Sequence, residues 1–266
     1  MKTANLQIAI IGAGNMGGAI ARGLSKGTLI DAKNIRVSDV SQVNLQAINS
    51  FDSEIVVNSS NLDIIKDADI IVLAVKPWLV EVIAKEIESK IEYKKQIIVS
   101  IAAGVDFAKL TDYFDTDATM FRVIPNTAID VLQSVSTISA FNANAEQEEL
   151  ILSLFAELGK AFLVPETQLN AFMALSSCGI AYAFRYIRAA MEGGVEMGIY
   201  PNVAKEVVIQ TLRGAIDLLE TNGTHPEVEI DKVTTPGGIT IKGLNEMEAN
   251  GFTNAVIKGL KASHLK

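Results

Sequence analysis

The sequence has few of the side chains that hold metals or cross-link a chain. Among its 266 residues, Cys178 is the only cysteine, and His225 and His264 are the only histidines. One thiol can form neither an internal disulfide framework nor a thiolate zinc site, and such sparing use of cysteine is typical of a reducing cytosol. The two histidines lie far apart in the sequence, so there is no two-histidine metal motif. We therefore expect a cytoplasmic protein without a metal site.

Basic residues and long apolar runs are also scarce. The chain has 23 Lys and Arg against 31 Asp and Glu, a net charge of −8, and no basic cluster that could track a phosphate backbone. Its longest uncharged run, residues 167–184, contains Thr, Gln, Asn and Ser, whereas a membrane span needs about 20 mostly apolar residues. The first residues lack the long apolar segment of a signal peptide. We expect a soluble protein with neither nucleic acid nor a membrane as partner.

Apolar residues, by contrast, make up 49% of the chain, and up to residue 165 they follow two alternating patterns. Strands are predicted at residues 8–11, 35–37, 55–57, 70–75, 97–101 and 119–123, and helices at 19–25, 42–49 and 79–87. Edge strands at 135–138 and 162–164 would flank a helix at 145–158, with Asn144 as its N-cap. Nearly continuous apolar strands between helices are typical of a parallel sheet covered on both faces. We predict a doubly wound, Rossmann-like α/β domain at residues 1–165.

From residue 166 onward the strand pattern stops. Apolar segments of helical period predict helices at 169–197 and 203–219, and two shorter helices around Leu244 and Val256. The first segment contains small side chains that would let two helix backbones approach closely: Ser176, Ser177, Cys178, Gly179, Ala181 and Ala183. Such a run fits ordinary core packing and a subunit interface about equally well. We predict an all-helical second domain at residues 166–266.

A glycine-rich turn directly follows the first predicted strand and opens a helix. Its sequence is GAGNMG, at residues 12–17. In this spacing Gly12 permits a tight turn, Gly14 lets the backbone approach a pyrophosphate, and Gly17 permits close helix–strand packing. The N–H groups at the helix N-terminus, where Asn15 and Met16 lie, would face the phosphates. The turn therefore predicts a dinucleotide-binding site.

Asp39 ends the second predicted strand, where dinucleotide-binding domains carry the acidic residue that accepts hydrogen bonds from a ribose 2′-OH. Its charge should repel a 2′-phosphate, although Ser38 and Ser41 could still bind one. The alternative is an aspartate that only stabilises a turn.

Three further motifs lie where ligands meet a sheet or a helix. AVKP at residues 74–77 and PNT at 125–127 both follow predicted strands and should line the cofactor crevice. TTPGGIT at residues 234–240 leads into a helix whose N-terminal N–H groups could hold a carboxylate. Considered separately, AVKP also fits a generic strand–helix junction, and TTPGGIT also fits a turn between helices.

Together these motifs resemble those of the Δ1-pyrroline-5-carboxylate reductase family over essentially the whole chain. The shared elements are GAGNMG, AVKP, AAGV at 102–105, PNT, ALS and GIAY within 174–182, and TPGGIT at 235–240 followed by Gly243 and Leu244. The last element resembles the family's C-terminal signature and is the most specific. The sequence departs from the family pattern at Ile124, Ala128, Thr235 and residues 176–182, but no departure removes a group that we assign to chemistry.

The resemblance implies hydride transfer from NADPH or NADH to the C=N carbon of 1-pyrroline-5-carboxylate, which yields L-proline in the last step of proline biosynthesis. It implies that the backbone N–H groups of Gly237 and Gly238 hold the substrate carboxylate, beside Thr235 and Pro236. The Thr240 hydroxyl would hydrogen-bond the ring nitrogen and assist proton delivery. The resemblance also implies an interlocked homodimer whose interface closes the substrate pocket, with a ring of dimers as the larger alternative.

The expected cofactor residues divide between the two halves of the dinucleotide. By the resemblance, Asn61 contacts the adenosine half, whereas Lys76, Pro77, Ala103 and the 125–126 loop line the nicotinamide half. The full expected set is Gly12, Gly14, Asn15, Met16, Gly17, Ser38, Asp39, Asn61, Ala74, Val75, Lys76, Pro77, Ala103, Pro125 and Asn126. Because position 40 is Val where many relatives carry an arginine nearby, we predict that both cofactors work and that NADH is used better than in a typical relative.

Two other functions remain open at this point. The β-hydroxyacid dehydrogenases share a GxGxMG start and a helical second domain. Their pattern includes a catalytic lysine and an asparagine on the long helix, but residues 179–190 contain neither residue type. The other alternative is a non-catalytic nucleotide-binding paralogue that lost the substrate site. Retention of TTPGG at 234–238 and of Thr240 argues against it.

Overall fold

The computed structural model describes residues 6–264, which divide into two compact units between Ser177 and Cys178. The first unit includes helical residues beyond Pro165, among them Leu169 and Ala174, which are both buried. The domain boundary at residue 165 stays a prediction.

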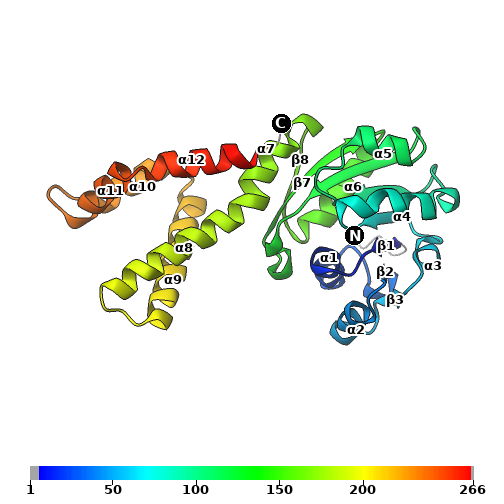
Figure 1. Cartoon of the computed structure of the whole chain (residues 1–266), viewed down its shortest axis with the longest axis horizontal. Helices are drawn as coiled ribbons and strands as arrows, with labels where there is room; N and C mark the ends of the chain where they lie inside the picture. The colour runs from blue at the N-terminus through cyan, green and yellow to red at the C-terminus, as the bar shows by residue number, and fades with distance from the viewer. Residues whose placement is uncertain (1–5, 265–266) are drawn as a thin grey trace. The chain divides into compact units, whose positions relative to one another are not determined.

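The first unit is built on one eight-stranded sheet with the order β3-β2-β1-β4-β5-β6-β7-β8 (Figure 1). Its strands are β1 (Ile8–Ile11), β2 (Ile35–Ser38), β3 (Val56–Asn58), β4 (Ile70–Leu73), β5 (Ile97–Ser100), β6 (Thr119–Ile124), β7 (Ser134–Phe141) and β8 (Gly159–Leu163). The chain runs outward from β1 through β2 to β3 and then returns to β4 on the other side of β1. Such a reversal of strand order opens a crevice at the carboxyl ends of the strands. The predicted doubly wound fold is confirmed.

The sheet is parallel from β3 to β6, but β7 runs antiparallel to β6 and parallel to β8. The reason lies in the connections. A short 3₁₀ helix, Thr127–Val131, joins β6 to β7, whereas a parallel pair needs a longer crossover. Helix α6 (Ala145–Ala156) supplies that crossover between β7 and β8, and Asn144 caps it as predicted.

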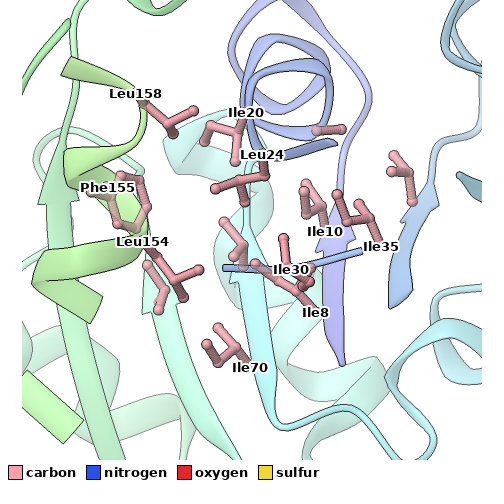
Figure 2. Packing of buried hydrophobic residues seen from close by; sticks show 14 of the residues in the cluster. Ile8, Ile10, Ile20, Leu24, Ile30, Ile35, Ile70, Leu154, Phe155 and Leu158 are labelled. Atoms are coloured by element: carbon pink, nitrogen blue, oxygen red, sulfur yellow. The ribbon is translucent and has the colours of Figure 1, made fainter. Parts of the chain in front are cut away.

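Helices cover both faces of the sheet because alternate residues of each strand point to opposite sides. Ile8 and Ile10 of β1 pack in a cluster with α1 (Asn15–Ser25), α2 (Gln42–Phe51) and α6. Ala9 and Ile11 pack in a second cluster with α3 (Asn61–Ile65), α4 (Val80–Ile87) and α5 (Phe107–Tyr113). Figure 2 shows Leu24 of α1 and Leu154 of α6 over the same face of the sheet as Ile10.

A partly buried ion pair holds the end of the first unit against its sheet. Arg122 of β6 donates from Nη1 to Oε1 of Glu166 at 2.6 Å, and the backbone N–H of Phe107 donates to the same oxygen at 2.8 Å. Just beyond Glu166 come α7 (Leu169–Met173) and a π-helical turn, Ala174–Cys178. The pair thus anchors the segment in which the sheet domain turns into helix.

The second unit is wholly helical in the described residues. It contains α8 (Gly179–Glu196), α9 (Pro201–Asn222), α10 (Pro226–Val233), α11 (Ile239–Ala249) and α12 (Phe252–Ser263). α8 and α9 pack closely at Gly194, where an added Cβ would lie 3.2 Å from the Cβ of Ala204. α12 returns to α8, because the Tyr182 hydroxyl hydrogen-bonds Ser263 and the carbonyl oxygen of Gly259.

Two details differ from the sequence expectations for the second region. The predicted helix 169–197 is interrupted by the π-helical turn, which adds one residue to a helical turn and cannot be read from apolar spacing. α10 was not predicted, because it has only eight residues and few of them are apolar. Its start signal, Pro226 at the first helical position, was nevertheless present in the sequence.

The small residues of the predicted close crossing are not packed in the manner of a core. Ala181 and Ala183 are exposed in the described chain, while Ser177 donates a hydrogen bond to the carbonyl oxygen of Pro125 at 2.7 Å. The core-packing interpretation is therefore wrong for Ala181 and Ala183, and the subunit interface stays a prediction. Among the helices within residues 6–264, none is long and apolar enough to cross a membrane.

Candidate functional site

A cavity of about 690 Å³ lies in the first unit at the carboxyl ends of the central strands. It is lined by all the cofactor residues expected from the sequence except Gly17 and Asn126, that is by Gly12, Gly14, Asn15, Met16, Ser38, Asp39, Asn61, Ala74, Val75, Lys76, Pro77, Ala103 and Pro125. Asp39 and Lys76 are the charged residues in this lining. A cavity of this size, mostly apolar with a few polar groups, has the features of a small-molecule site.

The glycine turn between β1 and α1 is shaped by backbone contacts. Gly12 has φ +104°, and a Cβ there would lie 2.5 Å from the carbonyl oxygen of Ala74. A Cβ on Gly17 would lie 1.9 Å from the carbonyl oxygen of Gly12, so Gly17 packs under the turn and does not face the cavity. Both positions therefore require glycine for steric reasons.

Gly14 differs from these two because a Cβ there would meet nothing within 4 Å. It is the N-cap of α1, has no side-chain cap hydrogen bond, and is followed by no acidic residue in the first turn. α1 has 11 residues, and its uncapped first-turn N–H groups face the cavity, where they would attract an anion. The open space beside Gly14 thus fits the pyrophosphate of a dinucleotide.

Polar groups at the end of β2 are held by an internal network. The Asp39 carboxylate accepts hydrogen bonds from the N–H groups of Ala13 and Ser41, each at 2.7 Å, and from Nδ2 of Asn44 at 3.3 Å. Beside it, the Ser38 hydroxyl lies 2.6 Å from Oδ1 of Asn61. Hydrogen bonds within the chain therefore fix the side chains of Ser38, Asp39 and Asn61 at this end of the cavity.

The opposite side of the cavity is formed by the loop after β6 and by α7. Asn126 is buried and shapes this loop, because its side chain accepts a hydrogen bond from the N–H of Ala128 and its own N–H donates to Ser134. Met173 and Ser177 line the cavity, although the sequence reasoning did not assign them to it. The hydrogen bond from Ser177 to Pro125 explains this placement. Ser177 lay within the small-residue run, but nothing in that run indicated contact with a strand end.

The expected substrate segment belongs to the second unit. Gly237 has φ +71°, which glycine adopts without strain, and the N–H of Gly238 donates to the carbonyl oxygen of Thr235 at 2.9 Å. Gly238 is the N-cap of α11 and has no side-chain cap hydrogen bond, and Thr240 lies in the first turn of this helix. Pro236, Gly237 and Thr240 are exposed. This segment offers backbone donors and one hydroxyl at a helix N-terminus.

The first unit defines a nucleotide-dependent oxidoreductase of the Rossmann type, joined to a separate helical unit. Residues 7–104 match the family described as NADP oxidoreductase, coenzyme F420-dependent, and residues 166–266 match the family described as pyrroline-5-carboxylate reductase dimerisation. Pyrroline-5-carboxylate reductase 1 of Dictyostelium discoideum is 34% identical over 99% of this chain, and the Glycine max pyrroline-5-carboxylate reductase is 34% identical over 96%. The chain belongs to the pyrroline-5-carboxylate reductase family.

Solved structures agree with this assignment. The Plasmodium falciparum pyrroline carboxylate reductase, described with NADP bound, has a TM-score of 0.88 at 25% identity and covers 97% of this chain and 95% of its own. The Coxiella burnetii pyrroline-5-carboxylate reductase has a TM-score of 0.89 at 26% identity and covers 97% and 96%. This chain spans 94% of the Glycine max relative but only 49% of the Dictyostelium one. The resemblance found in the motifs is thus confirmed, and the cofactor is a nicotinamide dinucleotide.

Proposed function

We propose that the chain reduces 1-pyrroline-5-carboxylate to L-proline with NADPH or NADH, the last step of proline biosynthesis. The observation that carries the proposal is the pairing of a dinucleotide-type cavity, open at Gly14, with the TPGGIT segment at a helix N-terminus in a chain of this family. The β-hydroxyacid dehydrogenase alternative has no comparable support, since residues 179–190 lack both the lysine and the asparagine of its pattern.

The cavity residues would divide the work of binding the cofactor. The first-turn N–H groups at Asn15 and Met16 would bind the pyrophosphate beside Gly14, because the helix begins there without a cap. Ser38, Asp39 and Asn61 would contact the adenosine ribose, whereas Ala74, Val75, Lys76, Pro77, Ala103 and the loop of Pro125 and Asn126 would hold the nicotinamide half. Gly12 and Gly17 act through the shape of the turn.

The reaction needs orientation more than a strong acid or base. When bound, the reduced nicotinamide supplies a hydride to the C=N carbon, and a protonated ring nitrogen makes that carbon electrophilic. The Gly238 N–H expected to hold the substrate carboxylate already donates to the carbonyl oxygen of Thr235. The Gly237 N–H and the uncapped first-turn N–H groups of α11, next to Thr235 and Pro236, would therefore hold that carboxylate. The Thr240 hydroxyl would hydrogen-bond the ring nitrogen and keep its proton in place. This scheme agrees with a chain that has only two histidines.

A homodimer would complete the site. The helices of the second unit expose many apolar side chains, and residues 166–266 match a family described by dimerisation. Covering these exposed apolar side chains with a second copy of the chain would remove them from water and stabilise the dimer. Such dimers could also assemble into a ring, which is the larger oligomer that we propose as the alternative. The lone cysteine favours a cytoplasmic location.

The test is a reductase assay on the purified chain with 1-pyrroline-5-carboxylate, comparing NADH with NADPH. We expect oxidation of the reduced cofactor that depends on the pyrroline, and proline-dependent reduction of NAD⁺ or NADP⁺ at alkaline pH. Turnover of a 3-hydroxy acid in place of proline would favour a β-hydroxyacid dehydrogenase. Tight dinucleotide binding with no turnover of either would favour the non-catalytic paralogue.

A further inference from the structure

The end of β2 carries a feature that bears on which dinucleotide the cavity accepts. We propose that Asp39 is a specificity-determining residue that makes the chain prefer NADH over NADPH. The inference rests on the proposed use of a nicotinamide dinucleotide in this cavity. It concerns the ribose next to the adenine, where NADP(H) carries a 2′-phosphate and NAD(H) a hydroxyl.

Hydrogen bonds hold the Asp39 carboxylate in one position. One carboxylate oxygen accepts the N–H of Ala13 in the glycine turn, and the other accepts the N–H of Ser41, each at 2.7 Å. The carboxylate therefore joins the glycine turn after β1 to the N-terminus of α2 and lies at the cavity wall. A fixed carboxylate can accept hydrogen bonds from a ribose hydroxyl, but it repels a phosphate dianion.

The side-chain donors of Ser38, Asn44 and Asn61 are already engaged, whereas the Ser41 hydroxyl accepts the N–H of Asn44. The Ser38 hydroxyl faces Oδ1 of Asn61 at 2.6 Å, and Nδ2 of Asn61 donates to Oε2 of Glu86 at 2.9 Å. Nδ2 of Asn44 points to Asp39 at 3.3 Å. A 2′-phosphate would have to break these hydrogen bonds to recruit the same donors. Glu86 also adds a second negative charge behind Asn61.

Within residues 38–44, which the structure describes, no cation lies beside Asp39. Residues 38–44, SDVSQVN, contain no Lys or Arg, and Val40 is 96% exposed at the position where a basic side chain would meet a phosphate. Lys76 lines the cavity but follows β4, which lies two strand spacings from β2, or roughly 10 Å. The N-terminus of α2 would attract an anion, but Asp39 already places its own carboxylate there.

The expected preference differs from what the Plasmodium relative, described with NADP bound, would suggest. The direct test is therefore equilibrium binding to the full-length protein, measured by titration calorimetry with NADH, NADPH, ADP and 2′-phospho-ADP. We expect NADH to bind at least about tenfold more tightly than NADPH, because one charge-assisted contact is exchanged for a repulsive one. ADP should bind more tightly than 2′-phospho-ADP by a similar factor.

Two variants locate the effect. Asp39→Asn keeps a side-chain oxygen for the Ala13 N–H but removes the charge, so the preference for NADH should shrink by about tenfold. Val40→Arg adds a cation at an exposed position, and NADPH should then bind at least as tightly as NADH. The matched control is Asp112→Asn, which removes the same charge from an exposed site on α5 and should leave the ratio unchanged.

The outcomes separate this inference from the proposed function. A binding preference for NADH that Asp39→Asn weakens, in a protein that does not reduce 1-pyrroline-5-carboxylate, supports the inference and contradicts the proposed function. Equal or tighter binding of NADPH to the unaltered protein overturns the inference, whatever the reductase assay gives. So does a preference for NADH that neither Asp39→Asn nor Val40→Arg changes.

Discussion

In the first unit, the apolar side chains of the strands are buried on both faces of the sheet; in the second, many apolar side chains of the helices are exposed. Ile10 and Ile11, for example, are covered on opposite faces of β1 by different helices. In α8 to α12, by contrast, Gly194 and Ala204 are the only fully buried residues that the structure describes. One unit completes its core within a single chain, and the other does not.

This difference in burial indicates where each unit obtains its stability. Each Å² of apolar surface that is buried contributes about 25 cal/mol to the free energy of folding or association. A unit that buries little apolar surface within its own chain must therefore bury it against another chain. α9 shows this most clearly, since Val203, Val207 and Leu218 lie on one face at helical spacing, and all are exposed. We name these three residues the α9 stripe. A second copy of the chain would cover it in the proposed dimer.

The largest expected effect comes from a charge placed in the α9 stripe. Val207 is 52% exposed in the single chain, so Val207→Asp would be nearly harmless to a monomer. In a dimer that covers this position, an unpaired carboxylate in an apolar interface costs at least about 3 kcal/mol, which weakens the dimer by more than about 100-fold. Sedimentation velocity at micromolar concentration measures the change.

The control for this variant is Asn202→Asp, which adds the same charge to the first turn of α9, where an anion is tolerated. We expect the control to remain dimeric. The first unit should still bind dinucleotide in both variants, because its core does not depend on a partner. An unchanged dimer for Val207→Asp would show that the α9 stripe lies outside the interface.

The next effect tests whether ligand binding in the first unit can be lost without loss of its fold. Gly14 has φ −67° and ψ −168°, an extended conformation that valine tolerates, and a Cβ there would meet no protein atom within 4 Å. Gly14→Val should therefore fold, yet its branched side chain would occupy the pyrophosphate space. We expect dinucleotide affinity to fall at least about 100-fold by calorimetry, since the anion contacts at the helix N-terminus are lost.

A suitable control is Ala108→Val, which adds the same branch on an exposed face of α5. It should bind the cofactor normally. If Gly14→Val keeps its circular dichroism spectrum and its affinity, the pyrophosphate does not lie at this turn.

A smaller effect tests whether the second unit contributes to chemistry as well as to assembly. Thr240→Ala removes a hydroxyl from the first turn of α11 but leaves the backbone N–H groups of Gly237 and Gly238 in place. The loss of one hydrogen bond to the reacting group, about 1–3 kcal/mol, lowers kcat/KM roughly 10- to 100-fold. Thr240→Ser should restore most of the activity. A folded, dimeric and fully active Thr240→Ala variant would remove Thr240 from the mechanism.

The smallest effect concerns local stability within the second unit. Hydrogen bonds from the Lys232 ammonium and the Thr224 hydroxyl lower the pKa of Glu229 from 4.5 to about 2. A carboxyl whose pKa is lower in the folded state stabilises the fold fully above pH 4.5, and this contribution is lost as the pH falls toward 2. Glu229→Gln should therefore lose less thermal stability than the unaltered protein between pH 5 and pH 2.5. Glu227→Gln, on the same helix, is the control. If Glu229→Gln and the unaltered protein lose the same thermal stability over this pH range, the Glu229 contacts do not stabilise α10.

The elements that could be predicted from the sequence are those whose structure depends on neighbouring residues alone. The buried strands, the GAGNMG turn and the Asn144 cap depend on a few neighbouring residues, so their patterns are local. The direction of β7 was not predicted, because it depends on the length of the connection after β6. Glu86 and Met173 were missed for another reason. They come close to the cavity only after folding, when Asn61 meets Glu86 and α7 reaches the strand ends.

The contact between α7 and the edge strand β8 has a consequence for synthesis of the chain. β8 ends the sheet, and its Phe162 and Leu163 are 43% and 42% exposed. Phe172 of α7 lies against Phe162, with ring centroids 6.4 Å apart. An edge that presents strand backbone and apolar side chains together is a template for aggregation. α7 covers part of this edge through Phe172, so a chain shortened to residue 165 would expose Phe162 further during synthesis and should be more prone to aggregate than one that includes α7.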